Sequence, residues 1–528
     1  MLKPYSYTRR EFLRRSAVVS AVYAGAYAAE PETASPRTYQ ICFAPQILDN
    51  NPDLLQIVAD AGVSTIWLAG FFYGYWPAPI DHVMEWRDRI EKMGLAAHVV
   101  NVPLGHPGDS LGAKDGSFPL SPPSHWKLAL RPDGSTYAGT SLHEPATEEN
   151  VKAMQELNAR GVKRVFLDDD FRLAIGPGTI GGCFCDAHKK QFMERGGYND
   201  SQWQELLDAV RTRTLSPILR VWVDFTCDQL TASFRAMQAA APNIELGNMV
   251  MYLGAEKAGI RLSDYSNALL RVGELMFDDK SFAPVKGKTD ELFSVLFHRR
   301  FVAPERAFSE TTAFPSDKLS AANMAAKLTI STIADVRNTT YMSGVTPFPF
   351  THWETLVSAM KLQASMHAAI AGQTPRGPLK HFWGEASRYV GDDKPFSLFL
   401  AMGVPFEITD TPANDGWTFL SDADAKSLEN LSTPGTKLLC RPGAANRIEG
   451  VDETLEALFA WRRGVLPSLK NVPYIEDEKP VICAWYPSIR TALIWNPAES
   501  RENFSLRYGD STRDVTLGPL ESTLLTSL

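Results

Sequence analysis

Carboxylates follow two short apolar runs of the sequence, at positions where buried strands would end. Asp168, Asp169 and Asp170 come directly after Leu167, and Glu310 follows a second apolar run. Hydrolysis of a glycosidic bond needs one protonated and one ionised carboxyl group. Three adjacent aspartates cannot all ionise easily, so one pKa should rise and suit a general acid. Helix capping with a solvated charge run, and a metal site on the three aspartates, are the alternatives.

The elements that must position these carboxylates alternate between strand and helix from residue 37 onward. The predicted strands are Tyr39–Ala44, Ser64–Ala69, Leu95–Val102, Arg164–Leu167, Ile244–Met251, Glu274–Phe277, Arg306–Ser309 and Thr339–Met342. Eight alternations predict a (β/α)8 TIM barrel, in which catalytic groups stand at the carboxyl ends of the strands. A doubly wound open sheet is the alternative, although no glycine-rich phosphate fingerprint follows the first strand.

Two smaller units follow the barrel, which we assign to residues 37–368. Residues 369–468 alternate again and predict a second α/β unit with strands at 397–402, 403–408, 417–420 and 436–439. Residues 469–528 contain short strands separated by turn residues, which indicates an antiparallel β-sandwich.

The segment Leu167–Phe171 resembles the strand-four motif of glycosidases with the family 42 β-galactosidase architecture, where the usual order is apolar-Asp-Asn-Glu-aromatic. By this resemblance Asp170 takes the place of the acid/base glutamate, Asp169 that of the asparagine, and Glu310 that of the strand-seven nucleophile. An aspartate acid/base with a glutamate nucleophile is closest to glycoside hydrolase family 164, which are retaining β-mannosidases. The layout is also similar: barrel, flavodoxin-like trimerisation domain and C-terminal β-sandwich.

The resemblance implies a retaining exo-glycosidase that hydrolyses β-glycosides of oligosaccharides without a cofactor, with Glu310 as nucleophile and Asp170 as acid/base. It implies a β-mannosidase first and a β-galactosidase-like enzyme as the alternative, assembled as a homotrimer. Two other classes remain open from the residues themselves. One is a non-catalytic carbohydrate-binding protein on a degenerate barrel, and the other is a metal-dependent hydrolase that uses the aspartate run and the cysteine and histidine loop that follows it.

Other residues at predicted strand ends could line a sugar subsite. Tryptophans could stack on a pyranose face, polar side chains could hold hydroxyl groups, and an arginine could keep an aspartate ionised; the alternatives are core packing and a structural ion pair. The substrate-binding candidates are Asp168, Asp169, Arg172, Trp67, Asn248, Tyr252, Asp278 and Trp353.

A cysteine cluster follows strand four closely. Cys183, Cys185 and His188 offer three ligands, and Asp186 could be a fourth for tetrahedral zinc. Some family 42 relatives hold a structural zinc near this loop, which favours a structural metal over a catalytic one. The alternative is a pair of reduced, packed thiols, and the working expectation is that the protein needs no metal.

Composition and the N-terminus bear on partners and location. The 528 residues carry 53 basic and 61 acidic side chains, a net charge of −8 that argues against nucleic-acid binding. Residues 1–29 contain Arg9-Arg10 and an apolar stretch that ends in small residues, which predicts a cleaved twin-arginine signal peptide. We therefore expect a periplasmic or secreted protein whose mature form has no membrane segment.

Overall fold

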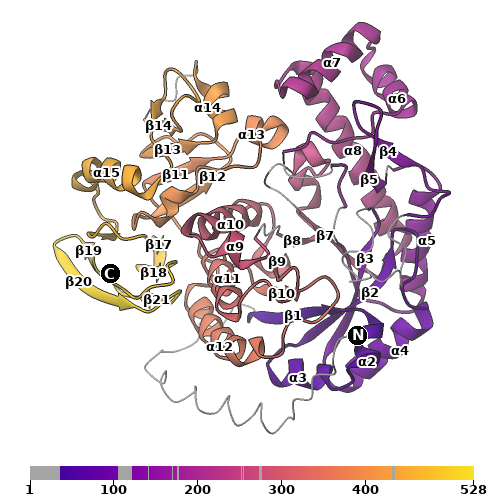
Figure 1. Ribbon diagram of the computed structural model, residues 1–528, viewed down its shortest axis with the longest axis horizontal. Helices are drawn as coiled ribbons and strands as arrows, with labels where there is room; N and C mark the ends of the chain where they lie inside the picture. The colour runs from indigo at the N-terminus through magenta and orange to yellow at the C-terminus, as the bar shows by residue number, and fades with distance from the viewer. Residues whose placement is uncertain are drawn as a thin grey trace.

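The computed structural model describes most of the chain after residue 35. The described residues are 36–104, 122–140, 142–168, 171–174, 178–250, 253, 255–272, 276–430 and 435–528. The predicted signal peptide and three site candidates, Asp169, Asp170 and Tyr252, lie outside these ranges. Figure 1 shows a barrel ringed by helices, with the second unit and the C-terminal sandwich beside it.

Eight parallel strands close into a barrel in the order β1-β10-β9-β8-β7-β6-β3-β2. Their bounds are β1 Thr38–Phe43, β2 Thr65–Phe72, β3 Ala96–Val102, β6 Arg164–Leu167, β7 Glu245–Met249, β8 Leu269–Arg271, β9 Ala307–Thr312 and β10 Asn338–Met342. The predicted (β/α)8 barrel is confirmed.

The sixth barrel strand was misplaced by the sequence prediction. It is β8, which ends at Arg271, before the predicted segment Glu274–Phe277 begins. The arginine interrupts the apolar run Leu269–Val272, so that this run does not read as a buried strand. In the barrel the same arginine points inward and is neutralised by carboxylates from other strands.

Most helices cover the outside of the barrel. Their bounds are α2 Pro45–Asn50, α3 Leu54–Asp60, α4 Ile80–Lys92, α5 Ala146–Ala159, α6 Asp186–Gly196, α7 Asp200–Thr212, α8 Pro217–Ala240, α9 Asp279–Phe282, α10 Val285–Arg299, α11 Ala321–Ile333 and α12 His352–Ile370. The exceptions are α6 and α7, which pack with part of α8 in a lobe that has its own hydrophobic cluster (Figure 1). Residues 200–240 form two helices, α7 and α8, rather than one. Ser216 caps the second one and Pro217 begins it, since a proline cannot continue a preceding helix.

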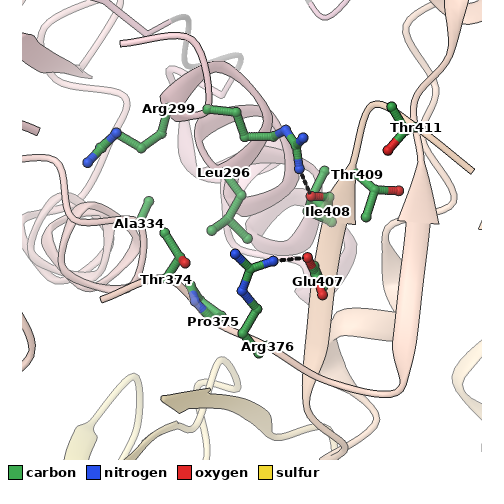
Figure 2. Close-up of a pocket in the computed structure, with 11 residues that line it drawn as sticks. Leu296, Arg299, Ala334, Thr374, Pro375, Arg376, Glu407, Ile408, Thr409 and Thr411 are labelled. Atoms are coloured by element: carbon green, nitrogen blue, oxygen red, sulfur yellow. Dashed lines mark hydrogen bonds and ion pairs between the residues drawn. The ribbon is translucent and has the colours of Figure 1, made fainter. Parts of the chain in front are cut away.

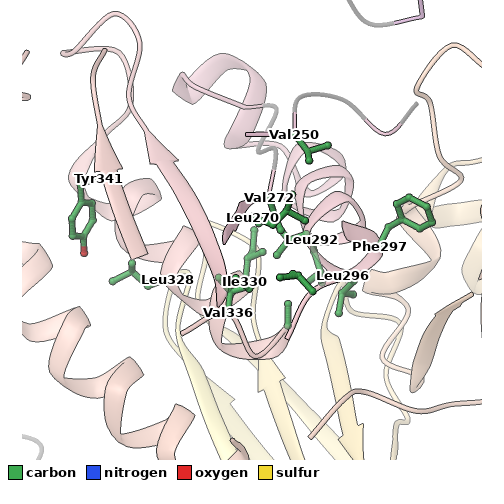
Figure 3. Close-up of a cluster of buried hydrophobic side chains, with 14 of the residues drawn as sticks. Val250, Leu270, Val272, Leu292, Leu296, Phe297, Leu328, Ile330, Val336 and Tyr341 are labelled. Atoms are coloured by element: carbon green, nitrogen blue, oxygen red, sulfur yellow. The ribbon is translucent and has the colours of Figure 1, made fainter. Parts of the chain in front are cut away.

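Successive residues of each barrel strand face opposite layers. Leu270 packs outward against Leu292 and Leu296 of α10 (Figure 3). Its neighbour Leu269 belongs to the cluster inside the barrel. This alternation places Arg271, two residues after Leu269, on the inward side as well.

The second unit is a parallel five-stranded sheet in the order β12-β11-β13-β14-β15, the order of flavodoxin-like folds. Its strands are β11 Leu379–Phe382, β12 Phe406–Thr409, β13 Trp417–Leu420, β14 Lys437–Cys440 and β15 Glu449–Gly450, with helices α13 Glu385–Val390, α14 Asp422–Leu428 and α15 Leu455–Val465. The strand expected over 397–402 is instead a 3-10 turn, Leu398–Ala401, and β11 was not predicted.

The C-terminal unit is the expected antiparallel sandwich, built from two three-stranded sheets, β16-β19-β20 and β17-β18-β21. Its strands are β16 Tyr474–Ile475, β17 Ile482–Tyr486, β18 Thr491–Trp495, β19 Glu502–Tyr508, β20 Ser511–Leu517 and β21 Ser522–Leu525. Within the described ranges, no helix is long and apolar enough to cross a membrane.

Candidate active site and metal centre

A charged layer closes the barrel interior near the carboxyl ends of its strands. Asp168 follows β6, Arg271 ends β8, and Glu310 lies on β9. Their exposed fractions are 4%, 1% and 5%. Three ionisable side chains from three strands thus meet in a nearly dry environment, where charges interact strongly. We call these three residues the upper layer.

Arg271 links the two carboxylates of the upper layer. Its Nη2 donates a hydrogen bond to Asp168 Oδ1 and lies 3.8 Å from Glu310 Oε1. The hydroxyl of Thr312 donates to the same Glu310 oxygen at 3.2 Å. Burial opposes the charged form of Arg271, but Asp168 and Glu310 outweigh that effect and raise the pKa of Arg271.

Cys42 on β1 lies close to the upper layer, and the charges of Arg271, Asp168 and Glu310 act on the pKa of its thiol. Burial raises the pKa of the Cys42 thiol, which the positive charge of Arg271 opposes only in part. The thiol therefore stays protonated at neutral pH and cannot serve as a nucleophile. Glu310 is the better candidate for that role.

Below the upper layer the barrel is filled by aromatic rings. Trp67 is 1% exposed, with its ring centre 4.9 Å from those of His98 and Phe166 and 6.2 Å from that of Phe308. We call these four residues the lower layer. The expectation that Trp67 offers a stacking surface to a sugar finds no support here, because the ring is buried among core side chains.

Trp353 and Asn248 are also placed away from a subsite. Trp353, 1% exposed, packs at the start of α12 against Tyr341 and Phe348, in the layer between barrel and helices. Asn248 alternates with Met249, whose sulfur contacts Arg271 inside the barrel, so Asn248 points outward. The sequence prediction that these two residues bind substrate used closeness to a strand end and ignored which face the side chain takes, and the structure gives it no support.

Asp278 and Arg172 have local structural roles. Asp278 caps α9 by accepting hydrogen bonds from the Ser281 hydroxyl at 2.7 Å and the Ser281 amide at 2.8 Å. These two bonds, the hydroxyl's first, lower the pKa of Asp278. Arg172 is buried in the loop after β6, where its Nε donates to the Ala174 carbonyl at 3.2 Å. Asp278 is therefore a helix cap in the structure, and the expected substrate roles of Asp278 and Arg172 stay predictions.

Two aromatic residues that the sequence prediction missed follow β2 directly. Tyr75 and Trp76 are half-buried just past the carboxyl end of this strand, and Trp76 packs against Phe71 with ring centres 5.5 Å apart. Their signal in the sequence is the dense aromatic run Phe71–Trp76. They are better placed than Trp67 to contact a sugar.

The cysteine cluster gains a fourth member in the structure. The ligand atoms of His143, Cys183, Cys185 and His188 all lie within 4.8 Å of one another. Cys185 Sγ is 3.4 Å from His143 Nε2 and 3.2 Å from His188 Nδ1, and Cys183 Sγ is 3.8 Å from His143 Nε2. His143 replaces the expected Asp186, which begins α6 instead.

This donor set fits zinc. With Zn–S bonds of about 2.3 Å and Zn–N bonds of about 2.0–2.1 Å, a tetrahedral site has ligand–ligand edges of about 3.3–3.8 Å. The contacts among His143, Cys183, Cys185 and His188 fall in or near this range. Burial lowers the pKa of His188 to about 4 and also lowers that of His143, so both imidazoles are neutral and able to ligate. Burial raises the pKa of the Cys183 thiol, so a thiolate there needs a cation beside it.

A separate crevice lies between α10 and the second unit (Figure 2). Its arginines already have partners: Arg300 donates to the Ile408 carbonyl, and Arg376 donates to Glu407. The first of these bonds joins the barrel to the second unit, and the second lies within the second unit. The crevice is therefore a domain joint, remote in the fold from Glu310.

No protein-family model and no curated protein matches the chain. Among solved structures it is similar to the β-galactosidase of psychrophilic Marinomonas ef1, with a TM-score of 0.60 and 10% identity over 93% of this chain and 100% of that one. The cold-adapted β-galactosidase of Rahnella sp. R3 has a TM-score of 0.58 and 11% identity, over 94% and 100%.

A third neighbour is the family 42 β-galactosidase Gan42B, with a TM-score of 0.59 and 10% identity over 93% of this chain and 98% of that one. The chain has the family 42 β-galactosidase fold. Identities this low establish the architecture alone, so the expected three-part layout is confirmed. The resemblance to family 164 stays a prediction.

Proposed function

We propose that the protein is a retaining β-glycosidase. The observation that carries the proposal is Glu310, a buried carboxylate near the carboxyl end of the seventh strand of a family 42-like barrel, 3.8 Å from the Arg271 guanidinium. Barrel enzymes place their chemistry at this end of the strands. A carboxylate beside a fixed cation is suited to attack an anomeric carbon.

The reaction would follow a double displacement. Glu310 attacks the anomeric carbon, and the bond to the leaving oxygen breaks as Asp170 protonates that oxygen. Asp170 then takes a proton from water, which attacks the glycosyl-enzyme and releases Glu310. Asp168 is committed to its ion pair with Arg271, which leaves the next aspartates of the run for the proton transfers.

For the sugar we propose a β-galactoside. The solved neighbours are named β-galactosidases, whereas the aspartate at position 170 is the feature that favours a β-mannoside. The two sugars differ in the orientation of two hydroxyl groups, which a few side chains read. A substrate panel separates them directly.

The test is hydrolysis of aryl β-glycosides by the purified mature chain, with Glu310→Gln as the matched variant. We expect the wild type to cleave the β-galactoside fastest and the variant to lose at least about 10³-fold in kcat. A 2-deoxy-2-fluoro glycoside should label Glu310, detected by peptide mass spectrometry. A variant that keeps substantial activity would contradict the proposed nucleophile.

The acid/base role of Asp170 has its own test. Asp170→Ala should slow aryl glycosides with poor leaving groups far more than activated ones, because only poor leaving groups need a proton. The slope of log kcat/KM against the pKa of the leaving phenol measures this. Equal losses on all substrates would reject Asp170 and direct attention to Asp169.

We also propose that His143, Cys183, Cys185 and His188 hold a structural zinc ion. Bound there, the metal would tie the segment before α5 to the loop that follows the aspartate run, and all catalytic steps remain with the carboxylates. We expect about one zinc per chain by elemental analysis, lost in Cys185→Ser and His143→Ala. Cys483→Ser, which alters a buried thiol in the sandwich, is the control. Unchanged zinc content in the cluster variants would reject the site.

Export and assembly complete the proposal. We propose cleavage of the twin-arginine signal peptide and a homotrimer in solution. N-terminal sequencing of the secreted protein tests the first, and light scattering of the mature chain tests the second. A retained N-terminus or a monomeric mass would contradict them.

A further inference from the structure

We propose that Arg271 is a positioning residue for Glu310, and that Asp168 sets how strongly Arg271 acts. This inference rests on the proposed function, because it concerns the nucleophile of that reaction. The guanidinium would orient the Glu310 carboxylate and hold it ionised, while Asp168 takes a share of the same positive charge.

The contacts of Arg271 show which groups its positive charge can stabilise. Its Nη2 donates to Asp168 and faces Glu310, and its two terminal nitrogens also touch methionine sulfurs, Nη2 at 2.6 Å from Met249 and Nη1 at 3.0 Å from Met342. Thioethers are weak acceptors that compete poorly with carboxylates. The charge of Arg271 is therefore directed at Asp168 and Glu310.

The carboxylate of Glu310 is oriented through one oxygen. Oε1 accepts from Thr312 and is also the oxygen nearest Arg271. Two contacts from different strands on one atom restrict rotation about the last side-chain torsion. A nucleophile held in one orientation spends more of its time in a reactive geometry.

The charges of the three residues also match the reaction cycle. One cation and two carboxylates give the upper layer a net charge of −1 when Glu310 is ionised. When Glu310 forms the ester bond to the sugar its negative charge disappears, and Arg271 and Asp168 remain as a neutral buried pair. The covalent intermediate therefore leaves no unbalanced buried charge among these three residues.

Few other groups can account for the ionisation of Glu310. Among the described residues, the charged or titratable groups shown to interact in this layer include Arg271 on β8, Asp168 after β6 and Cys42 on β1. Cys42 stays a neutral thiol because burial raises its pKa. Met342 on β10 and Thr312 on β9 are uncharged. Asp169 and Asp170 lie outside the described residues and are unchanged in every variant below.

The experiment compares the acidic limb of the kcat/KM profile in two single variants. Arg271→Met removes the cation, so the acidic limb should shift to higher pH by about one unit or more. Asp168→Asn removes the competing anion, so the limb should move down. A purely structural role predicts loss of stability in both variants and no opposite shifts in the limb.

Arg271→Lys and a double variant keep the test possible if Arg271→Met does not fold. Arg271→Lys keeps the charge and should shift the limb less than Arg271→Met, although the forked contacts are lost. If Arg271→Met alone does not fold, Arg271→Met combined with Asp168→Asn leaves no unpaired buried charge of the pair. That double variant should still show a raised limb, because Glu310 has lost its cation.

The buried pair of Lys257 and Asp393, in the contact with the second unit, is the matched control. Both side chains are about as buried as the pair of Arg271 and Asp168 but lie outside the upper layer. Lys257→Met with Asp393→Asn should lower the melting temperature and leave the acidic limb in place.

The outcomes separate this inference from the proposed function. In one outcome the acidic limbs of the kcat/KM profiles coincide in wild type, Arg271→Met and Asp168→Asn, while Glu310→Gln is inactive. That result would overturn the role of Arg271 and leave the proposed glycosidase activity intact. An active Glu310→Gln enzyme, or a panel on which the wild type cleaves nothing, would overturn both.

Discussion

The upper and lower layers of the barrel interior differ in chemistry although the same strands supply them. Phe166 stands two residues before Asp168, and Phe308 stands two residues before Glu310. Because side chains alternate along a strand, each pair points inward at successive levels. Two residues along each strand, the inward-facing side chains therefore change from packed aromatic rings to buried charges.

This difference assigns the two layers different roles: the lower layer mainly stabilises the fold, and the upper layer carries the chemistry. Buried charges cost solvation free energy unless they are paired and hydrogen-bonded. The lower layer, with Trp67 at its centre, contributes the burial that offsets this cost. Trp67 is itself anchored, since its indole nitrogen donates to Gln40 at 2.5 Å. Substitutions in the upper layer should therefore mainly reduce activity, and substitutions in the lower layer should mainly reduce stability.

The largest effect is expected from making the upper layer resemble the lower one. Glu310→Leu should reduce kcat by at least about 10³-fold, since the nucleophile is gone. The same change should raise stability by about 1–3 kcal/mol, because one desolvated carboxylate is removed and Arg271 keeps its partner Asp168. Urea unfolding and turnover of the best panel substrate measure the two effects. A destabilised Glu310→Leu protein would show that Glu310 also supports the fold.

The next effect concerns the centre of the lower layer. Trp67→Ala should cost about 3–5 kcal/mol of unfolding free energy, because it leaves a cavity among tightly packed rings. Activity per folded molecule should stay within about tenfold of wild type. Trp67→Phe, which keeps an aromatic ring, is the matched control and should cost less. Urea unfolding monitored by circular dichroism measures the difference. Loss of turnover with stability intact would mean that Trp67 contacts substrate after all.

The smallest effect is a dependence on pH that belongs to His98. Burial lowers the pKa of His98 to about 4, helped by the charge of Arg164, whereas an unfolded histidine titrates near 6.5. Its contribution to stability is therefore complete above pH 6.5 and is lost as the pH falls toward 4, by on the order of 3 kcal/mol.

His98→Gln keeps a polar side chain of similar size and removes this titration. The fall in unfolding free energy between pH 6.5 and 4 should then be shallower than in wild type. Equal slopes in the two proteins would assign the acid sensitivity to other groups. Urea unfolding over this pH range gives the answer.

How much the sequence predicted differs between the fold and the site. Seven barrel strands were located because short strand-like runs alternate with longer helical segments along the chain. β8 was misplaced because Arg271 breaks its apolar pattern. That single error hid the residue around which the upper layer is built, since an arginine in a loop gives no reason to expect a buried ion pair.

The candidate site shows the same limit. Glu310 and Asp168 could be found from strand ends, but Trp67, Trp353 and Asn248 were assigned to substrate although their side chains point into core layers. Position along a strand predicts height in the barrel. It does not predict which face a side chain takes when the register is uncertain by one residue.

Sequence by itself determined the alternation of strand and helix, the order of the three units and the presence of carboxylates at two strand ends, because these follow from local periodicity and residue type. Only the tertiary structure decided that Arg271 meets Asp168 and Glu310, and that His143 meets Cys183, Cys185 and His188. Barrel closure and loop packing bring these residues together across 39 to 103 positions of chain, and no local pattern encodes such distances.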